Sequence, residues 1–574
     1  MALKPDKKNR IIVTQVTWEH IYLHLELEGR ALEEFDYFVG NAAGSRYPVE
    51  CSQGQLCLNI VNIPEAEVLP AGEWFLFARA KDSEASAAEQ TLEVSHACGY
   101  TLEGLDKIYR YATGVMAYAV TFEIRDGEEM ARLSKKSGSV LPCVDCQSED
   151  LFLCIRTEYY KKKKSDGKHH PVAEACSGKE VLKGIVRVLL QKVLNGYYGL
   201  LHACTKRDGK HILFMSETRI MAGGNLQALD ERMKERGLDQ EYQISYAFSK
   251  TLEQGTGGRI VSWLKMIRLV AKQDFIFVDD YVPLFQTIDL RKDTELIQLW
   301  HAGVGFKSVG YARFGRRGSP HPRGTCHRRY DYVVVGASGL IPVYEEVFGI
   351  PKERILPLGL PRMDQYLNNE KRESFRDEFY QKYPELKNKK LILFAPTYRG
   401  NGQRDAYYPW DKIDFQAAYE MCGDTYIFAL KMHPFVRDLP EISEKMRNRI
   451  MAFSAEDDIN QLFYVTEILI SDFSSNIYEF SVQNKPMIFY VFDKDYYQLT
   501  RGVHRRLEKF APGKICETFD QVVRTIEQQD FETERREHFV KSSFDAKQGN
   551  AGDQIIDRII LECKGHVKDE GVFL

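Results

Sequence analysis

The sequence has few of the features that mark a membrane-spanning, secreted or nucleic-acid-binding protein. Its 574 residues carry a formal net charge of only −4, so no overall positive charge favours nucleic acid. No uncharged apolar run reaches the roughly 18–20 residues that a membrane-spanning helix needs. The N-terminus lacks an apolar segment followed by a small-residue cleavage site, which predicts no secretion signal. We therefore expect a protein that is soluble or lies at a membrane surface, without nucleic acid as a partner.

Cysteine pairs with the spacing of a metal site are also scarce. Twelve cysteines are scattered along the chain, and Cys143 and Cys146 form a CxxC pair with no second ligand pair at a suitable spacing. Asp457 and Asp458 are adjacent carboxylates, but Asp458 stands before Ile459, where a helix cap is expected. The sequence thus predicts reduced, mostly structural cysteines and supports no metal site.

At 574 residues the chain is too long for one hydrophobic core, which predicts two or three domains. Residues 1–160 contain short strand-like runs, such as Ile21–Gly29 and Glu73–Arg79, separated by polar or Pro/Gly turns. This pattern predicts a β-sandwich-like domain of about immunoglobulin size. No catalytic constellation occurs here, so acceptor handling and simple support both remain open.

Residues 161–204 are predicted to be a basic amphipathic connector. It begins with the unbroken lysine run Lys161–Lys164, and a helix is predicted from about Lys179 to Leu201. One face of that helix is apolar and the adjoining stripe is basic: Leu182, Ile185, Val186, Leu189 and Val193 beside Lys179, Lys183 and Arg187. The helix could lie on a membrane, since anionic lipid adds about 1 kcal/mol per nearby Lys or Arg. Alternatively, its apolar face is core and its lysines are merely solvated.

From residue 205 onward, short apolar runs alternate with helical stretches, which predicts parallel sheets covered on both faces. The runs form one series within residues 205–348 and a second within residues 349–574. They are His211–Met215, Gln243–Phe248, Phe275–Val278, Leu296–Trp300 and Tyr332–Val335, then Arg354–Leu358, Leu391–Ala395, Tyr426–Leu430, Glu467–Ile470 and Pro486–Tyr490. Two such series predict two doubly wound α/β domains facing a cleft, with ligands at the carboxyl ends of the strands.

Three loops that follow these runs carry polar groups. The first, Trp300–Lys307, offers His301 as a proton acceptor near pH 7, glycines that permit close approach to a ligand, and the positive charge of Lys307. The second, Lys431–Pro434, contains His433, and the third is Ser471–Asn476. Each histidine could also be an ordinary loop histidine with a satisfied hydrogen bond.

The third loop has a physical interpretation of its own. Ser474 and Ser475 stand at a predicted helix start, where hydroxyls and about half a positive charge suit a pyrophosphate. Glu479, one turn further, could accept a hydrogen bond from a ribose hydroxyl. The alternative is simple N-capping of the helix by Ser474 or Asp472.

Taken together, the loop motifs resemble the CDP-glycerol and CDP-ribitol phosphotransferases that build teichoic acids. The resemblance covers roughly residues 200–560, with the motifs in the right order, and the N-terminal β region does not add to it. The motifs are Gln298–Gly303 with Phe306–Lys307 and Gly310, Gly359–Asp364, Ala395–Arg399, Lys431–Pro434, Ser471–Ser475, Arg501–Gly502 and Ala511–Gly513. Ala302 and Phe306 resemble the ribitol-type branch, which leaves the donor open between CDP-glycerol and CDP-ribitol.

The resemblance implies a GT-B architecture with the nucleotide on the C-terminal half. It also implies transfer of glycerol phosphate or ribitol phosphate from a CDP-polyol to the terminal hydroxyl of a lipid-linked teichoic acid or related polymer, with release of CMP. No cofactor is implied beyond the donor substrate. The protein is expected to lie peripherally at the cytoplasmic face of the cell membrane, where an anionic membrane surface could be a partner, with the cytoplasm as the alternative location.

Residue roles follow from the same resemblance. His301 is the expected general base for the acceptor hydroxyl, and His433 is the second catalytic residue. Arg399 and the two serines are expected to bind the pyrophosphate with His433, and Glu479 the ribose. The other expected substrate-binding residues are Lys307, Arg362, Asp364, Thr397, Asp472 and Arg501.

Two other functions remain open at this point. A GT-B glycosyltransferase or a nucleotide-sugar epimerase also uses a C-terminal Glu and a phosphate-binding helix start. A non-catalytic module of an envelope-synthesis complex would have a degenerate cleft, against which the intact His301 and His433 argue.

Overall fold

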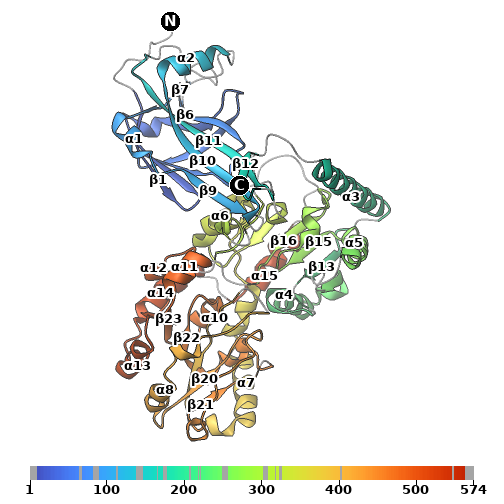
Figure 1. Cartoon of the computed structure of the whole chain (residues 1–574). Helices are drawn as coiled ribbons and strands as arrows, with labels where there is room; N and C mark the ends of the chain where they lie inside the picture. Colours follow the sequence, from blue (N-terminus) through green and yellow to red (C-terminus); the bar gives the residue numbers. More distant parts are fainter. Residues whose placement is uncertain are drawn as a thin grey trace. The chain divides into compact units, whose positions relative to one another are not determined.

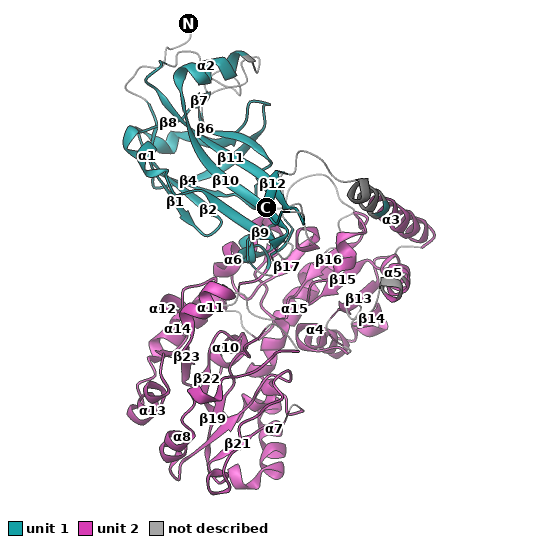
Figure 2. Cartoon of the chain, in the orientation of Figure 1, with its two compact units in different colours: residues 1–187, 310–325, 346–349 teal, residues 188–309, 326–345, 350–574 magenta. Residues whose placement is uncertain are grey.

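In the computed structural model, whose helices and strands Figure 1 labels, the chain forms two compact units (Figure 2). Unit 1 contains Met1–Arg187, Gly310–Thr325 and Glu346–Gly349, and unit 2 contains Val188–Val309, Cys326–Glu345 and Ile350–Leu574. The described residues are 10–63, 68–81, 89–111, 114–136, 147–164, 166–171, 178–205, 208–217, 219, 221–248, 256–301, 308–316, 319–321, 326–400, 404–454, 456–545 and 549–562. The CxxC pair, Ala302, Phe306 and Lys307 lie outside them, as do the side chains of Leu182 and Ile185.

Unit 1 contains one twelve-stranded sheet in the order β7-β6-β3-β4-β5-β2-β1-β8-β11-β10-β9, with β12 beside β11. Its strands are β1 (Ile12–Glu19), β2 (Tyr22–Glu28), β3 (Phe35–Gly40), β4 (Arg46–Ser52), β5 (Gln55–Asn59), β6 (Gly72–Ala80), β7 (Glu89–Thr91), β8 (Glu93–Val94), β9 (Lys107–Tyr111), β10 (Met116–Asp126), β11 (Leu151–Lys162) and β12 (His169–Pro171). Its helices are α1 (His96–Thr101) and α2 (Gly127–Lys136).

The predicted two-sheet sandwich of this unit is not confirmed, because the sheet closes on itself. Strand β11 is 12 residues long, so it pairs with β10 along one edge and still has room for β6 and β8 along the other. The pairing of Ile155 with Trp74 joins β11, near one end of the sheet path, to β6, near the other end. Alternating residues such as Leu23 and Leu25 are fully buried inside.

The basic segment after this sheet has two parts. Lys161 and Lys162 are the end of β11 and pair with His170 and His169 of β12, so the lysine run begins as β structure. The predicted helix is confirmed as α3 (Gly178–Ala203). No helix among the described residues is long and apolar enough to cross a bilayer.

The first sheet of unit 2 is parallel and has the order β14-β13-β15-β16-β17-β18. Its strands are β13 (His211–Ser216), β14 (Gln243–Phe248), β15 (Phe275–Val278), β16 (Glu295–Gln298), β17 (Tyr332–Val334) and β18 (Ile355–Leu356). The helices between them are α4 (Gly224–Glu235), α5 (Thr256–Val270) and α6 (Ile341–Phe348).

The second sheet of unit 2 is also parallel, in the order β21-β20-β19-β22-β23-β24. Its strands are β19 (Lys390–Phe394), β20 (Tyr426–Leu430), β21 (Ile450–Ala452), β22 (Thr466–Ser471), β23 (Met487–Tyr490) and β24 (Lys514–Cys516). Its helices are α7 (Asn369–Lys382), α8 (Phe415–Cys422), α9 (Ile459–Leu462), α10 (Asn476–Ser481), α11 (Lys494–Thr500), α12 (Leu507–Phe510), α13 (Phe519–Gln528) and α14 (Thr533–Ser543).

The predicted apolar runs of both series are thus confirmed as parallel strands. The run Arg354–Leu358, however, was predicted to begin the second series and instead forms β18 at the edge of the first sheet. In β19, Leu391 and Leu393 belong to the core on one face of the sheet, while Ile392 and Phe394 belong to the core on the other. A strand buried on both faces must be apolar at every position, which is why these strands read as continuous apolar runs. Two doubly wound sheets in tandem are the arrangement of a GT-B-type fold.

The end of the described chain returns to the first of these two sheets. Helix α15 (Ala551–Ile555) continues as a π-helical turn over Ile556–Leu561. Ile555, Ile556, Ile559 and Ile560 are buried in the core that contains Phe214 and Phe277. Asp364 anchors the start of α15, because its carboxylate accepts the N–H groups of Ala551 (3.2 Å) and Gly552 (3.0 Å).

Candidate active site

The second sheet of unit 2 reverses its strand order between β19 and β22, and the loops after these two strands meet there. In open α/β sheets, ligands bind in the crevice outside the carboxyl ends of the strands at such a switch point. Asp472, directly after β22, accepts the N–H of Thr397 through Oδ1 at 2.7 Å. Its Oδ2 accepts Nη1 of Arg399 at 3.0 Å. The structure therefore brings Thr397, Arg399 and Asp472 together.

Arg399 is 7% exposed and its guanidinium is used within the protein. Its Nε and Nη2 donate to both carboxylate oxygens of Asp493 (2.7 and 2.8 Å), and Nη1 also donates to the Thr397 carbonyl (2.7 Å). Burial raises the pKa of Asp472, and the charge of Arg399 opposes that rise. This arginine therefore ties the loop after β19 to Asp472 and Asp493, which follow the neighbouring strands β22 and β23.

The serines of the third loop are at the start of α10, as predicted. Ser475 is the N-cap residue, but its side chain makes no capping hydrogen bond. Ser474 Oγ accepts the N–H of Asn476 at 3.3 Å. Asp472 does not cap this helix either, because both of its oxygens face the β19 loop. The hydroxyl of Ser475 is therefore not committed to capping.

His301 follows β16 and Trp300, whose φ of 51° lies in the left-handed region that a bulky residue seldom adopts. Nδ1 of His301 lies 2.8 Å from the main-chain oxygen of Asp279. A carbonyl oxygen can only accept, so Nδ1 carries the proton and Nε2 of the neutral ring is the proton acceptor. Although the residue has an exposed surface, burial of its imidazole lowers the pKa of His301. The ring is thus held in the neutral form that a general base requires.

Arg362 and Glu479 complete the surroundings of His301. Nη1 of Arg362 donates to the main-chain oxygen of His301 at 2.8 Å, and Nη2 forms an ion pair with Glu479. Glu479 is buried, and its Oε2 has no hydrogen-bond partner among the described residues. Burial raises the pKa of Glu479, whereas Arg362 opposes that rise. Three predicted residues from distant parts of the sequence are therefore connected in space.

His433 follows β20 on the second sheet and has the opposite tautomer. Its Nδ1 accepts the N–H of Phe435 at 3.2 Å, so the ring proton of the neutral form is on Nε2. Its ring contacts Tyr398 (5.0 Å between centroids) and Phe435 (4.4 Å). These contacts all come from the same half of unit 2 as His433. The neutral ring carries its N–H on Nε2, which can act as a donor.

Arg501 comes at the end of α11, and its N–H donates to the Tyr497 carbonyl at 2.8 Å. The Tyr497 ring stacks on Phe473, the residue before the serine pair, at 3.9 Å. The next residue, Gly502, accepts the N–H of Ser308 at 3.2 Å. Ser308 is the first described residue after the His301 loop, so the Arg501 turn contacts both halves of unit 2.

A polar cleft of about 550 Å³ adjoins this region in unit 2. Arg219, Arg362, Asp364, Lys371 and Asp458 are among its lining residues. The side chain of Asp458 caps α9 by accepting the N–H of Asn460, which confirms the predicted helix cap.

Two residues that support His301 were not predicted from the sequence. Asp279 directly follows β15, so the same strand-end rule that selected His301 could have selected it. Its Oδ2 accepts Nε of Arg219 at 2.7 Å. Asn225 is buried in α4, where nothing in its sequence surroundings signals a role.

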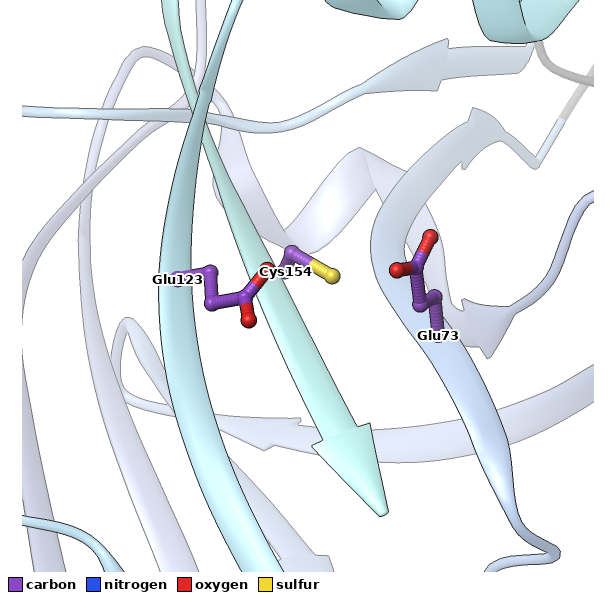
Figure 3. Close-up of side chains that lie close together, drawn as sticks. All are labelled: Glu73, Glu123 and Cys154. Carbon is purple, nitrogen blue, oxygen red and sulfur yellow. The ribbon is translucent and has the colours of Figure 1, made fainter. Parts of the chain in front are cut away.

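A group of metal-ligand type in unit 1 has a structural explanation. The ligand atoms of Glu73, Glu123 and Cys154 lie within 4.8 Å of one another (Figure 3). Arg125 donates to Glu73 (3.1 Å) and Glu123 (2.7 Å), and Arg156 also donates to Glu123 (3.3 Å), so both carboxylates are paired with arginines. Burial raises the pKa of Cys154 to about 12, which keeps the thiol protonated. The group is an ion-pair network of the closed sheet.

Comparison with known proteins agrees with this description of the fold. The chain is 36% identical over 351 residues to the teichoic acid ribitol-phosphate polymerase TarL of Staphylococcus aureus, a match that spans 61% of this chain and 62% of TarL. It is 30% identical over 389 residues to the teichoic acid ribitol-phosphate primase of Bacillus spizizenii, spanning 65% of this chain and 98% of the primase. The wall teichoic acid polymerase TagF shares the fold, with a TM-score of 0.53 at 21% identity over 69% of this chain and 100% of that chain.

The match to TarL thus spans less than two thirds of that protein's length. The sequence profile described as CDP-Glycerol:Poly(glycerophosphate) glycerophosphotransferase matches residues 198–561, the region that contains both sheets of unit 2. Because that profile covers more than half of the sequence, the chain belongs to the CDP-glycerol:poly(glycerophosphate) glycerophosphotransferase family.

Proposed function

We propose that the protein transfers ribitol phosphate, or glycerol phosphate, from a CDP-polyol to the terminal hydroxyl of a lipid-linked teichoic acid or related polymer, releasing CMP. The observation that carries this proposal is the neutral His301, with Nε2 as proton acceptor and with Arg362 and Glu479 joined to it. Family membership and the ribitol-phosphate relatives support the donor class, with CDP-ribitol as the first choice.

The proposed step is a direct displacement at the β-phosphorus of the donor. Nε2 of His301 takes the proton of the acceptor hydroxyl while its oxygen forms the new P–O bond. The bond between that phosphorus and the CMP oxygen breaks, and CMP leaves with its electron pair. Nε2–H of His433 and the hydroxyl of Ser475 donate to the phosphates and offset the charge that develops on them.

Other predicted residues have supporting roles in this proposal. Arg399, Asp472 and Thr397 hold the crevice loops at the switch point, so that Ser474 and Ser475 face the donor. Glu479, through Oε2, is proposed to bind the ribose, and Arg501 and Lys307 to add positive charge near the phosphates. We place the two halves of this catalytic region at residues 205–348 and 349–574, with the exception that β18 and α15 pack with the first half.

Separate incubation with CDP-ribitol and CDP-glycerol tests this function. The protein is supplied with a lipid-anchored polyol-phosphate oligomer as acceptor, and CMP and the lengthened oligomer are both measured. We expect CMP to accumulate in step with added phosphodiester units, faster with CDP-ribitol. Absence of CMP with either donor would overturn the proposal, and a glycosidic product would replace it with sugar transfer.

The pH dependence of kcat/KM provides a second test. His301 acts as a base only when neutral, so kcat/KM should fall as the pH drops through its pKa. Burial lowers that pKa below the ordinary 6.5, while Asp279 and Asp280 partly oppose the shift and Arg362 adds to it. The acid limb of the profile should therefore have its midpoint below pH 6.5. A midpoint at or above 6.5 that disappears in His301→Gln would contradict this environment for the base.

We also propose that α3 and α5 hold the protein on an anionic membrane. Leu189, Val193 and Leu200 of α3 are 55%, 65% and 65% exposed, so this face is not core. Arg268 of α5 donates to the Tyr197 hydroxyl, which joins the two helices, and Val261 of α5 is also exposed. Exposed Lys192, Lys265 and Arg268 supply positive charge for anionic headgroups.

Replacing Leu189, Val193 and Leu200 with serine should weaken binding to vesicles that contain phosphatidylglycerol, because apolar area enters the interface. Co-sedimentation measures the bound fraction, and Leu439→Ser, an exposed leucine on the other half, is the matched control. Replacement of Lys161–Lys164 with serine removes the charge, keeps the main chain of β11 that pairs with β12, and tests separately whether the lysine run of unit 1 contributes. If the triple variant and the control bind the vesicles equally, α3 does not contribute to membrane binding.

A further inference from the structure

We infer that Asn225 is a positioning residue for the transfer proposed above, setting His301 and Arg362 in their mutual arrangement. Asn225 is in the first turn of α4 and is 1% exposed. It touches neither the donor nor the acceptor in this proposal, and it acts through the two residues it holds. This inference rests on the proposed function. No motif of the sequence identifies Asn225.

The side-chain amide of Asn225 joins three segments of unit 2. Its Nδ2 donates to the main-chain oxygens of Leu299 (3.0 Å) and Trp300 (2.8 Å). Its Oδ1 accepts the main-chain N–H of Arg362 at 3.2 Å. The amide nitrogen therefore binds the segment that leads into His301, and the amide oxygen binds the turn that carries Arg362.

The Trp300 peptide needs such an anchor because its backbone is strained. Trp300 has a φ of 51°, a conformation that a bulky residue adopts only when its surroundings impose it. Its N–H donates to Oε1 of Gln298 at 2.7 Å, and its carbonyl accepts Nδ2 of Asn225. Because both its N–H and its carbonyl are hydrogen-bonded, Trp300 has a fixed main-chain conformation, which sets the orientation of the next residue, His301.

Arg362 closes the same arrangement from the other side. Its main-chain N–H is held by Asn225, and its guanidinium donates to the His301 carbonyl at 2.8 Å. Loss of the Asn225 amide would therefore release the His301 loop and the Arg362 turn together. A shift of about 1 Å in a base relative to its substrate can lower a rate roughly 100-fold, even when the substrate still binds.

Two substitutions separate the positioning role from a structural one. Asn225→Asp keeps the shape and the acceptor for Arg362 but loses both donors, and Asn225→Ala loses all three hydrogen bonds. Asn195 of α3 provides the matched control, because its Nδ2 donates to Gln191 O (3.1 Å) and Thr287 O (3.0 Å) and its Oδ1 accepts Asp289 N–H (2.7 Å). Asn195→Asp and Asn195→Ala thus break the same set of bonds elsewhere in unit 2.

For both Asn225 variants we expect kcat for CMP release to fall about 10- to 100-fold, with KM for the CDP-polyol changed less than about 3-fold. The Asn195 variants should lose a similar amount of thermal stability and keep kcat within about 3-fold of wild type. If Asn225→Ala does not fold, the kcat and KM of the isosteric Asn225→Asp variant provide the test.

A kcat loss no larger than in the matched Asn195 variant, or a loss confined to KM, would overturn the positioning role. Failure of the proposed function is distinguishable from this, because the unaltered protein would then release no CMP from either donor. If the unaltered protein releases CMP and Asn225→Asp has the same kcat, the positioning role is rejected and the proposed function stands.

Discussion

His301→Gln should lower the rate of CMP release by roughly 10²- to 10⁴-fold, the usual contribution of a general base. Glutamine can still donate a hydrogen bond to the Asp279 carbonyl, which His301 Nδ1 approaches at 2.8 Å, but it cannot take a proton from the acceptor hydroxyl. The variant therefore loses the proton acceptor and keeps the hydrogen bond to the Asp279 carbonyl. KM for the CDP-polyol should change much less than kcat.

The measurement is initial-rate CMP release at saturating donor, with thermal unfolding recorded on the same samples. His538→Gln, a change of the same kind at an exposed position on α14, is the control and should behave as wild type. A His301→Gln enzyme within a few-fold of wild type would remove His301 from the role of base. The proposal would then have to place the proton acceptor on another group of the cleft.

Arg399→Met should destabilise the domain built on the second sheet of unit 2 by about 3–5 kcal/mol, the cost of breaking a buried ion pair by removing one partner. Methionine fills much of the space but leaves Asp472, which is fully buried, and Asp493 without their cation. Burial already raises the pKa of Asp472 against the opposing charge of Arg399, so its carboxylate should take up a proton in the variant.

Urea unfolding followed by a probe in this domain measures the effect as a shift of the transition to lower urea. Arg524→Met on α13 is the control, because Arg524 and Asp520 form an exposed ion pair whose loss should cost about 1 kcal/mol or less. If the two variants unfold at the same urea concentration, Arg399 does not hold the crevice loops.

The parallel strands of unit 2 were predictable because burial on both faces leaves a local signal. Every position of β19 after Lys390 is buried, so the strand reads as an unbroken apolar run in the sequence alone. The loop residues could be selected for a related reason, since a polar residue directly after such a run lies at a strand end. Asp472 directly follows β22, and His301 and His433 each come three residues after the end of their strand.

In unit 1 the same reasoning located strands and did not predict how they join. The pattern of β6 or β11 says which side chains are buried, and it carries no information about which edges pair. Closure of the sheet depends on the pairing of Ile155 with Trp74, two residues far apart in the chain. Hydrogen bonds between main chains of this kind leave no residue signature.

The sequence by itself determined the doubly wound sheets of unit 2, the loops at their strand ends and the family, because periodicity and short motifs are local properties. Only the tertiary structure decided the tautomers of His301 and His433, the use of Arg399 inside the crevice loops and the link from His301 through Arg362 to Glu479. It also decided the place of Asn225. Each of these depends on which main-chain or side-chain group a residue meets from a distant segment, and that choice is made only when the chain folds.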